Sequence, residues 1–190
     1  MESVKDLLVE IKEKSELIVD LAYSAVILDS EDMAIEVQKL EEEMDDLVYK
    51  IRIKTMLAAT NPEEAEQLAG ILQVADAAKN LANAAADIVY LLDMDITSRP
   101  FLPSLFIKAD EKIHVVRVYE NSTIVNRTIG ELNIEAESGV RIIAIKRGRA
   151  WIYDPEDDVR IKSGDILIVR GTEAGYEFLD RVARGEESWD

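Results

Sequence analysis

The sequence predicts a two-domain α+β protein, in which an antiparallel three-helix unit is followed by a small α+β domain. The length of 190 residues fits two domains of about 100 residues each. In the first hundred residues, apolar side chains recur every three or four positions, which is the period of an amphipathic helix. After Pro103, short β-branched runs and turn residues replace that period. We predict a helical domain at 1–98, a linker at 99–108, an α+β domain at 109–185 and a polar tail at 186–190.

The first two helices follow from two apolar stripes. The first stripe comprises Val4, Leu8, Ile11, Ile18, Ala22 and Ala25, with Ser15 in the remaining slot. It is interrupted at 29–32, because serine and aspartate favour turns and helix N-caps. The second stripe comprises Met33, Val37, Leu40, Met44, Leu47 and Ile51. This second helix is predicted to end near Thr60-Asn61-Pro62, where proline occupies the first position of the next helix.

The third helix carries an alanine-rich stripe that predicts close helix packing. Its positions are Leu68, Leu72, Ala75, Ala78, Ala82, Ala85, Val89 and Leu92, and its end is expected at Ser98-Arg99-Pro100. Since the loops between the helices are short, the helices must run antiparallel. Three such helices make a thin bundle whose apolar faces are too wide to cover themselves. We therefore expect a homodimer.

The second half of the sequence predicts four strands and a closing helix. The strands are expected at Ile113 to Val118, Val140 to Ile145, Trp151 to Tyr153 and Ile166 to Val169. The last strand leads into Gly171-Thr172-Glu173, where Thr172 can cap a helix that continues through Val182.

The charge of the chain argues against nucleic acid as a partner. There are 39 acidic and 22 basic side chains, a net charge of −17. Nucleic acid is bound by clustered lysine and arginine, so we expect no nucleic-acid partner. Residues 1–100 hold 22 acidic and 9 basic side chains, or −13, whereas residues 101–190 hold 17 and 13, or −4. The absence of cysteine and of an apolar run near ~20 residues predicts a cytoplasmic location with no direct membrane insertion.

The second half resembles the TrkA-C domain, also called the RCK C-terminal domain. The segments that carry the resemblance are Ile113 to Val118, Thr128 to Leu132, Gly139 to Gly148 and Ile161 to Gly171. The resemblance implies a regulatory module of potassium channels and cation transporters that dimerises and, in several members, binds a small anionic ligand at the dimer interface. Asn126 stands where the family usually has glycine in a turn, and asparagine also tolerates left-handed backbone.

The first half is similar to one three-helix repeat of the PhoU family. The matching segments are Leu40 to Leu47 and Ala75 to Ala82. Family members with two repeats form paired three-helix bundles, which is consistent with a dimer of a single repeat. No Gly-x-Gly-x-x-Gly motif follows any predicted strand, so dinucleotide binding of the Rossmann type is not indicated.

The candidate ligand site is a basic turn in the second half. Arg147 and Arg149 flank Gly148, and guanidinium groups suit a phosphate group such as that of a nucleotide or cyclic dinucleotide. Asn126 and Arg127 belong to the candidate site as well, with Lys146 in the same turn and Arg141 expected near it, and the resemblance favours an interface pocket here. The alternative is that these cations pair only with the acidic residues at 154–158.

The candidate metal site is a set of carboxylates on the helices. Glu41 and Asp45 are four residues apart and share one helix face, and proteins similar to PhoU use such pairs for divalent metals. Asp76 matches the corresponding position on the third helix, but Leu72 stands where the family has a second acid. The alternative is a solvated acidic face.

The sequence predicts a regulator rather than an enzyme. His114 is the only histidine and lies in a predicted strand, and no nucleophile motif accompanies it. We expect a cytoplasmic regulatory subunit of cation transport, with potassium as the cation, that senses a small anionic ligand by dimer rearrangement beside a membrane channel or transporter. The alternative is a PhoU-like metal-binding or phosphate-signalling adaptor.

Overall fold

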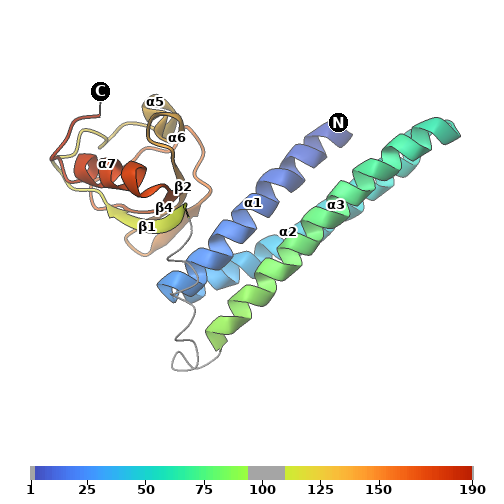
Figure 1. The fold of residues 1–190 in the computed structure, drawn as a ribbon, viewed down its shortest axis with the longest axis horizontal. Helices are drawn as coiled ribbons and strands as arrows, with labels where there is room; N and C mark the ends of the chain where they lie inside the picture. Colours follow the sequence, from blue (N-terminus) through green and yellow to red (C-terminus); the bar gives the residue numbers. More distant parts are fainter. Residues whose placement is uncertain (1–2, 94–109, 190) are drawn as a thin grey trace. The chain divides into compact units, whose positions relative to one another are not determined.

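The computed structural model describes residues 3–93 and 110–189. The chain divides into two compact units, Met1–Arg99 and Pro100–Asp190, which Figure 1 shows as a helical unit and a unit built on a sheet. The predicted linker at 99–108 lies outside the described residues. No helix in the described ranges has both the length and the apolar character needed to cross a bilayer.

The first unit consists of three long helices in an up-down-up arrangement (Figure 1). They are α1 (Val4–Leu28), α2 (Glu31–Ala58) and α3 (Pro62–Val89), and a short 3-10 helix, η1 (Tyr90–Asp93), follows α3. Each long helix begins at a side-chain N-cap, which is Ser3, Ser30 or Asn61. The predicted proline at the start of the third helix is confirmed. Its predicted end at 98–100 lies outside the described residues.

The buried stripe of each helix forms the core of this unit. All six predicted positions on α2 are buried, as are the predicted positions on α3 from Ala75 to Val89. Leu68 and Leu72 are only half-buried. On α1 the prediction was wrong at the start, because Leu7 is fully buried while Val4 and Leu8 are half-buried. Since α1 packs against both α2 and α3, its buried surface is wider than a single stripe.

The second unit is a four-stranded antiparallel sheet with helices. The strands are β1 (Lys112–Arg117), β2 (Val140–Arg147), β3 (Ala150–Tyr153) and β4 (Ile166–Gly171), in the spatial order β1-β4-β2-β3. All three pairs are antiparallel, and the β2–β4 register shifts between Ile142 and Ala144. The helices are α5 (Ile129–Leu132), α6 (Ile134–Ser138) and α7 (Glu173–Ala183). The four predicted strands and the helix capped by Thr172 are therefore confirmed.

The core of the second unit lies between the sheet and α7. Val116, Ile145 and Leu167 from the strands pack with Leu179 and Val182 from α7, and all five are fully buried. The first turn of α7 lies so close to the end of α6 that a Cβ atom on Gly175 would collide with the carbonyl oxygen of Ser138.

The predicted polar tail at 186–190 is wrong for Trp189, whose side chain is only 6% exposed. The indole packs against Phe178 with ring centroids 5.3 Å apart, and its Nε1–H donates to the Leu132 carbonyl over 3.0 Å. The Trp189 amide donates to Thr123 Oγ1 over 2.9 Å. An indole buries more apolar surface than the other side chains of this segment, so Trp189 packs on the domain while residues 186–188 remain exposed.

Candidate functional site

A cavity of about 270 Å³ lies in the second unit, beside the two short helices. Its walls come from α5, α6, the first residues of β2 and the turn that follows β3, and the lining residues are Ile129, Asn133, Ile134, Glu135, Val140, Arg141, Ile142, Asp154, Pro155 and Asp157. Isoleucine and valine side chains supply the apolar part of the lining. A volume near 300 Å³ is at the small end of those that hold organic ligands.

Two local features of the chain shape this cavity. Asn133 has a left-handed backbone, with φ of 49°, which ends α5 and directs the chain into α6. Gly130 brings α5 against the opposite wall, since its amide donates to the Asp157 carbonyl over 2.9 Å. A Cβ atom on Gly130 would lie only 3.0 Å from the Asp157 Cβ, so glycine permits this close approach.

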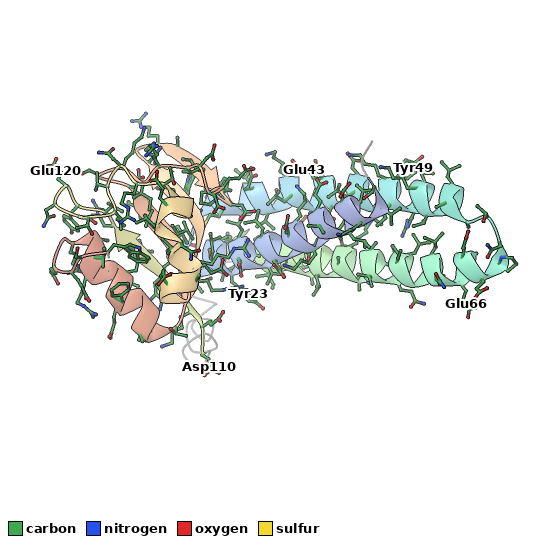
Figure 2. The ribbon with its side chains drawn as sticks, turned by 90° about the horizontal axis from the view of Figure 1, so that it is seen from above. Tyr23, Glu43, Tyr49, Glu66, Asp110 and Glu120 are labelled. Atoms are coloured by element: carbon green, nitrogen blue, oxygen red, sulfur yellow. The ribbon has the colours of Figure 1, made fainter. Side chains whose placement is uncertain are left out.

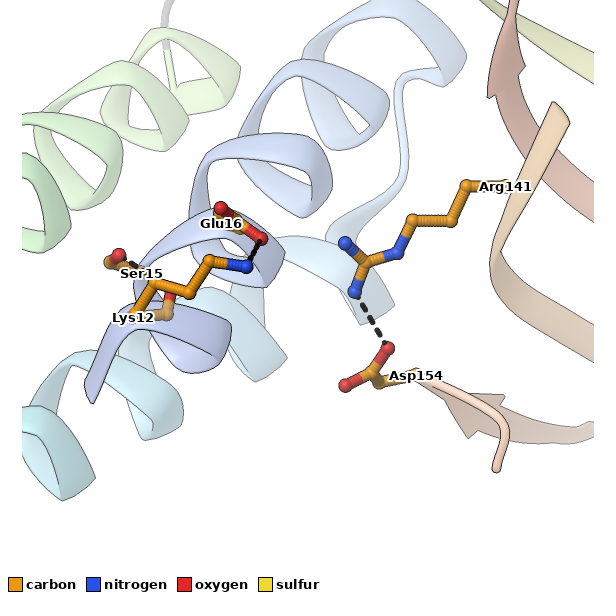
Figure 3. Close-up of polar contacts among 5 residues, drawn as sticks. All are labelled: Lys12, Ser15, Glu16, Arg141 and Asp154. Atoms are coloured by element: carbon orange, nitrogen blue, oxygen red, sulfur yellow. Dashed lines mark hydrogen bonds and ion pairs between the residues drawn. The ribbon is translucent and has the colours of Figure 1, made fainter. Parts of the chain in front are cut away.

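Arg141 is the one cationic side chain in the cavity lining. Its guanidinium Nη2 donates to Asp154 Oδ1 over 3.1 Å, as Figure 3 shows. The Arg141 side chain is 22% exposed. The lining also holds the carboxylates of Glu135, Asp154 and Asp157. An anionic group of a ligand would therefore be stabilised at Arg141, where it competes with Asp154, and repelled elsewhere.

The predicted ligand residues do not line this cavity, and two of them have structural partners. Arg147 makes two hydrogen bonds of 2.8 Å to the Asp165 carboxylate and one of 2.7 Å to the Arg160 carbonyl. Arg127 donates to the carbonyls of Trp189 and Glu131, over 3.3 Å in each case. These guanidinium groups hold loops together, so an anion would have to displace those bonds.

The other two predicted ligand residues lie in turns. Asn126 has a left-handed backbone, with φ of 67°, as expected for asparagine in place of glycine. Its carbonyl accepts a hydrogen bond of 2.7 Å from Arg160. Arg149 is exposed in the turn between β2 and β3, next to Gly148. Asn126 is exposed as well, whereas Arg127 and Arg147 are half-buried.

The predicted metal residues lie along the contact between α2 and α3. Asp45 pairs with Lys79 at 2.5 Å, and Asp76 pairs with Arg52 at 2.5 Å. Glu41 accepts a hydrogen bond of 3.0 Å from the Asn83 amide when that amide is oriented to satisfy both groups. Within residues 3–93 and 110–189, no three or more carboxylate or histidine side chains are grouped so that they could hold a metal ion. These carboxylates stabilise the contact between the two helices.

His114 lies on β1 and stacks on Tyr176 of α7, with ring centroids 3.9 Å apart and planes within 6°. Its Nε2 is 4.0 Å from Glu173 Oε2 and has no hydrogen-bond partner. Burial lowers the pKa of His114 from its ordinary value near 6.5, and Lys112 lowers it further, whereas Glu173 opposes the shift. The folded domain therefore favours the neutral imidazole.

This preference predicts how the stability of the domain depends on pH. Below about pH 6.5 the unfolded chain takes up a proton on His114 that the folded domain resists, so the free energy of unfolding falls as the pH falls. His114→Phe keeps a ring against Tyr176 and removes that proton. We expect urea midpoints measured at about pH 7.5 and about pH 5.5 to differ less in His114→Phe than in the wild type. An equal difference in both proteins would contradict this assignment.

Each of the two units matches the model of a known protein family. Residues 8–92 match the family model of the PhoU domain, and residues 113–182 match that of the TrkA-C domain. The chain carries a PhoU domain followed by a TrkA-C domain. The cavity and the four predicted ligand residues all lie in the TrkA-C domain, whereas the paired carboxylates lie in the PhoU domain.

Two curated relatives are potassium transport proteins. The chain is 36% identical over 67 residues to Ktr system potassium uptake protein C of Bacillus subtilis, which covers 35% of this chain and 30% of that protein. It is 32% identical over 88 residues to Potassium channel protein 1 of Methanocaldococcus jannaschii, covering 46% of this chain and 26% of that protein. The chain thus spans less than a third of the length of these relatives.

Solved structures of single domains also match. One is the RCK_C domain dimer of S. agalactiae BusR in complex with c-di-AMP, at 26% identity over 40% of this chain and 95% of that chain, with a TM-score of 0.38. Another is the RCK C domain of the potassium transport protein KtrA in complex with c-di-AMP, at 30% identity over 44% of this chain and 96% of that chain, with a TM-score of 0.36.

Asn133 and Glu135 were not predicted as site residues, and Asp154 was predicted only as an acidic partner for the basic turn. A signal for the cavity was present at Arg141, which is the one charged residue in the apolar run from Val140 to Ile145. A cation at that position indicates a polar surface on one face of the strand. Its partner Asp154 belongs to a turn whose geometry no periodicity predicts.

Proposed function

We propose that the chain regulates the transport of potassium across a membrane and that the TrkA-C domain senses a small anionic ligand in the cavity at α5 and α6. The observation that carries the proposal is a single cation, Arg141, in an otherwise apolar and acidic cavity within a domain of this family. The names of the two curated relatives support potassium as the transported ion.

The chemistry of the cavity favours a ligand with one phosphate group beside an apolar ring. A phosphate accepts two hydrogen bonds from one guanidinium, which the Asp154 carboxylate now contacts through one nitrogen. The isoleucine and valine side chains of the lining suit the face of a base. Nucleotides and cyclic dinucleotides have both parts.

The regulatory step needs no chemical reaction. A ligand that binds one arrangement of two paired copies more tightly than another shifts the population toward that arrangement, by no more than its difference in affinity. In this chain the exchange of Asp154 for phosphate at Arg141 frees the turn after β3. We propose that this turn transmits ligand binding to the arrangement of the paired copies.

The test of ligand binding compares two arginine variants. Calorimetric titration with AMP, ATP and cyclic di-AMP should find a ligand whose affinity falls at least about tenfold in Arg141→Gln, since a hydrogen bond to a charged group is worth about 1.5–3 kcal/mol. The matched control is Arg149→Gln, in the exposed turn, which should bind as the wild type does. If the affinity instead falls in Arg149→Gln and is unchanged in Arg141→Gln, the anion binds at the basic turn and not in the cavity.

The test of transport uses cells of the source organism that lack this chain. We expect their initial rate of potassium uptake to differ from that of cells that contain it, and the wild-type chain to restore the original rate. Arg141→Gln, produced at the same level, should give the rate of potassium uptake that the chain gives when no ligand is bound to it. An uptake rate that does not respond to the chain would overturn the transport proposal and leave the result of the binding test unaffected.

A further inference from the structure

α3 carries a second apolar stripe, on a side that neither α1 nor α2 covers. Its members alternate at spacings of four and three residues over five helical turns, and we call them the α3 seam: Gly70, Val74, Ala77, Leu81, Ala84 and Ile88. Val74 is 60% exposed and Leu81 is 54% exposed. Of the seam members, only Ile88 is half-buried, and the rest are exposed. Figure 1 shows α3 in green along its full length.

The α3 seam is free of charge in a strongly acidic domain. Residues 1–100 have a net charge of −13, yet no ionisable side chain belongs to the seam. The positions beside it on the helix hold the amides Gln67, Gln73 and Asn80 and the acidic residues Glu66 and Asp87. An uncharged apolar centre with a polar rim is typical of a protein interface, where charged residues are depleted at the core. For two acidic copies, such a strip is also where electrostatic repulsion is weakest.

The packing of a single chain does not require glycine at position 70. Glycine inside a helix costs about 1 kcal/mol relative to alanine. No atom of the described structure lies within 4 Å of the Cβ that an alanine would add at this position. A glycine that the fold itself does not require indicates a close approach by something outside the chain.

The order of large and small residues along the α3 seam fits a second copy in the antiparallel direction. The seam is symmetric about Lys79, so a twofold axis there places the following residues opposite each other: Ile88 and Gly70, Leu81 and Ala77, Val74 and Ala84. Each large side chain thus faces a small one. A parallel pair would instead place Leu81 against Leu81 and Gly70 against Gly70, leaving a gap at one level and crowding at the next.

We infer that the α3 seam is the surface through which two copies of this chain pair, with their α3 helices antiparallel. The spacing of 3.5 residues gives a left-handed pair of helices, and the glycine and alanine positions allow their axes to approach closely. The inference concerns the PhoU domain and does not rest on ligand binding by the TrkA-C domain. It specifies which helix face forms the contact in the predicted homodimer and that the two α3 helices run antiparallel.

Cysteine crosslinking of the full-length chain tests both the surface and the direction, because the native sequence contains no cysteine. A disulfide requires Cα atoms about 4.4–6.8 Å apart. In the antiparallel pair, position 70 lies beside position 88 of the other copy and about 27 Å from its own counterpart, at 1.5 Å per residue. A mixture of Gly70→Cys and Ile88→Cys chains should therefore crosslink on mild oxidation, whereas either variant alone should not.

Three other results would overturn the inference. Crosslinking of Gly70→Cys with itself would show a parallel pair. Crosslinking of Glu42→Cys, an exposed control on α2, to the same extent as the mixture would show random collision. Absence of any crosslink in the mixture would mean that another partner covers the α3 seam.

A second measurement does not depend on cysteine. Leu81→Lys places a charge in the centre of the α3 seam at an exposed position, so the fold of one chain should be unchanged. Tyr49→Lys, on the outer surface of α2 in Figure 2, is the matched control because Tyr49 is 66% exposed. We expect sedimentation equilibrium to show at least about a tenfold weaker self-association in Leu81→Lys than in the control. Equal association of the two variants would contradict the inference.

Discussion

Arg147→Ala should lower the free energy of unfolding of the TrkA-C domain by about 3 kcal/mol or more, the loss expected when one partner of a buried ion pair is removed. The Asp165 side chain is 1% exposed and accepts hydrogen bonds of 2.8 Å from two guanidinium nitrogens of Arg147, Nε and Nη2. The Lys162 amide is its other hydrogen-bond donor. Without the guanidinium, a carboxylate remains buried with its charge uncompensated.

The measurement is urea unfolding followed by tryptophan fluorescence. Both tryptophans, Trp151 and Trp189, lie in the second compact unit, which contains the TrkA-C domain, so the signal reports on this unit alone. Arg149→Ala, in the same turn but exposed, is the control and should change the stability by no more than about 0.5 kcal/mol. Asp165→Asn combined with Arg147→Ala should recover part of the loss, because it removes the buried charge. Equal stability of the two alanine variants would show that the ion pair contributes nothing.

Arg147 also shows why the candidate site was harder to predict than the fold. In the sequence, Arg147 and Arg149 are equivalent, since both flank Gly148 in a turn. Their difference depends on Asp165, which is 18 residues away and becomes a neighbour only when β4 pairs with β2. Hydrogen bonds between distant segments leave no periodic signal in one sequence.

The helices and strands were predictable because burial acts at a fixed period. The stripe from Met33 to Ile51 is buried at every predicted position on α2, since one face of that helix packs on its neighbours. On α1 the same reasoning failed at Leu7, because a helix that contacts two others buries more than one stripe. Turn chemistry was equally local, as the left-handed backbone of Asn126 shows.

The cavity could not be predicted because its residues come from separate turns. Arg141 and Asp154 are 13 residues apart, and they meet because β2 and β3 form a hairpin whose end brings Asp154 back beside the start of β2. The backbone of Asp154 has a φ of 42°, which is uncommon for a residue other than glycine. The strands were predicted, but the conformation of this turn was not. The acidic residues at 154–158 were therefore expected to pair with the basic turn as a whole, and the specific pairing of Arg141 with Asp154 was not predicted.

Trp189→Ala should destabilise the TrkA-C domain by about 3–5 kcal/mol, the usual cost of deleting a buried tryptophan. The indole fills the space beside Phe178 and satisfies the carbonyl of Leu132, which is the last residue of α5. Asn133, the next residue, lines the cavity. Loss of the indole therefore removes packing and also loosens the junction between α5 and α6.

Two further variants separate packing from the hydrogen bond. Trp189→Phe keeps most of the apolar contact but leaves the Leu132 carbonyl without its donor, so we expect a loss of about 1–2 kcal/mol. Trp151→Ala, on the half-buried edge strand β3, is the matched control for removal of an indole and should cost less than Trp189→Ala. The remaining tryptophan reports unfolding by fluorescence in each variant.

The same variants test whether Trp189 supports the cavity. If the Leu132 carbonyl must be held for Asn133 to line the cavity, Trp189→Phe should bind the ligand found by titration more weakly than the wild type, under conditions in which both proteins are fully folded. Trp151→Ala should bind that ligand as tightly as the wild type. Unchanged affinity in Trp189→Phe, together with the expected loss of stability, would show that the indole stabilises the domain without positioning the junction between α5 and α6.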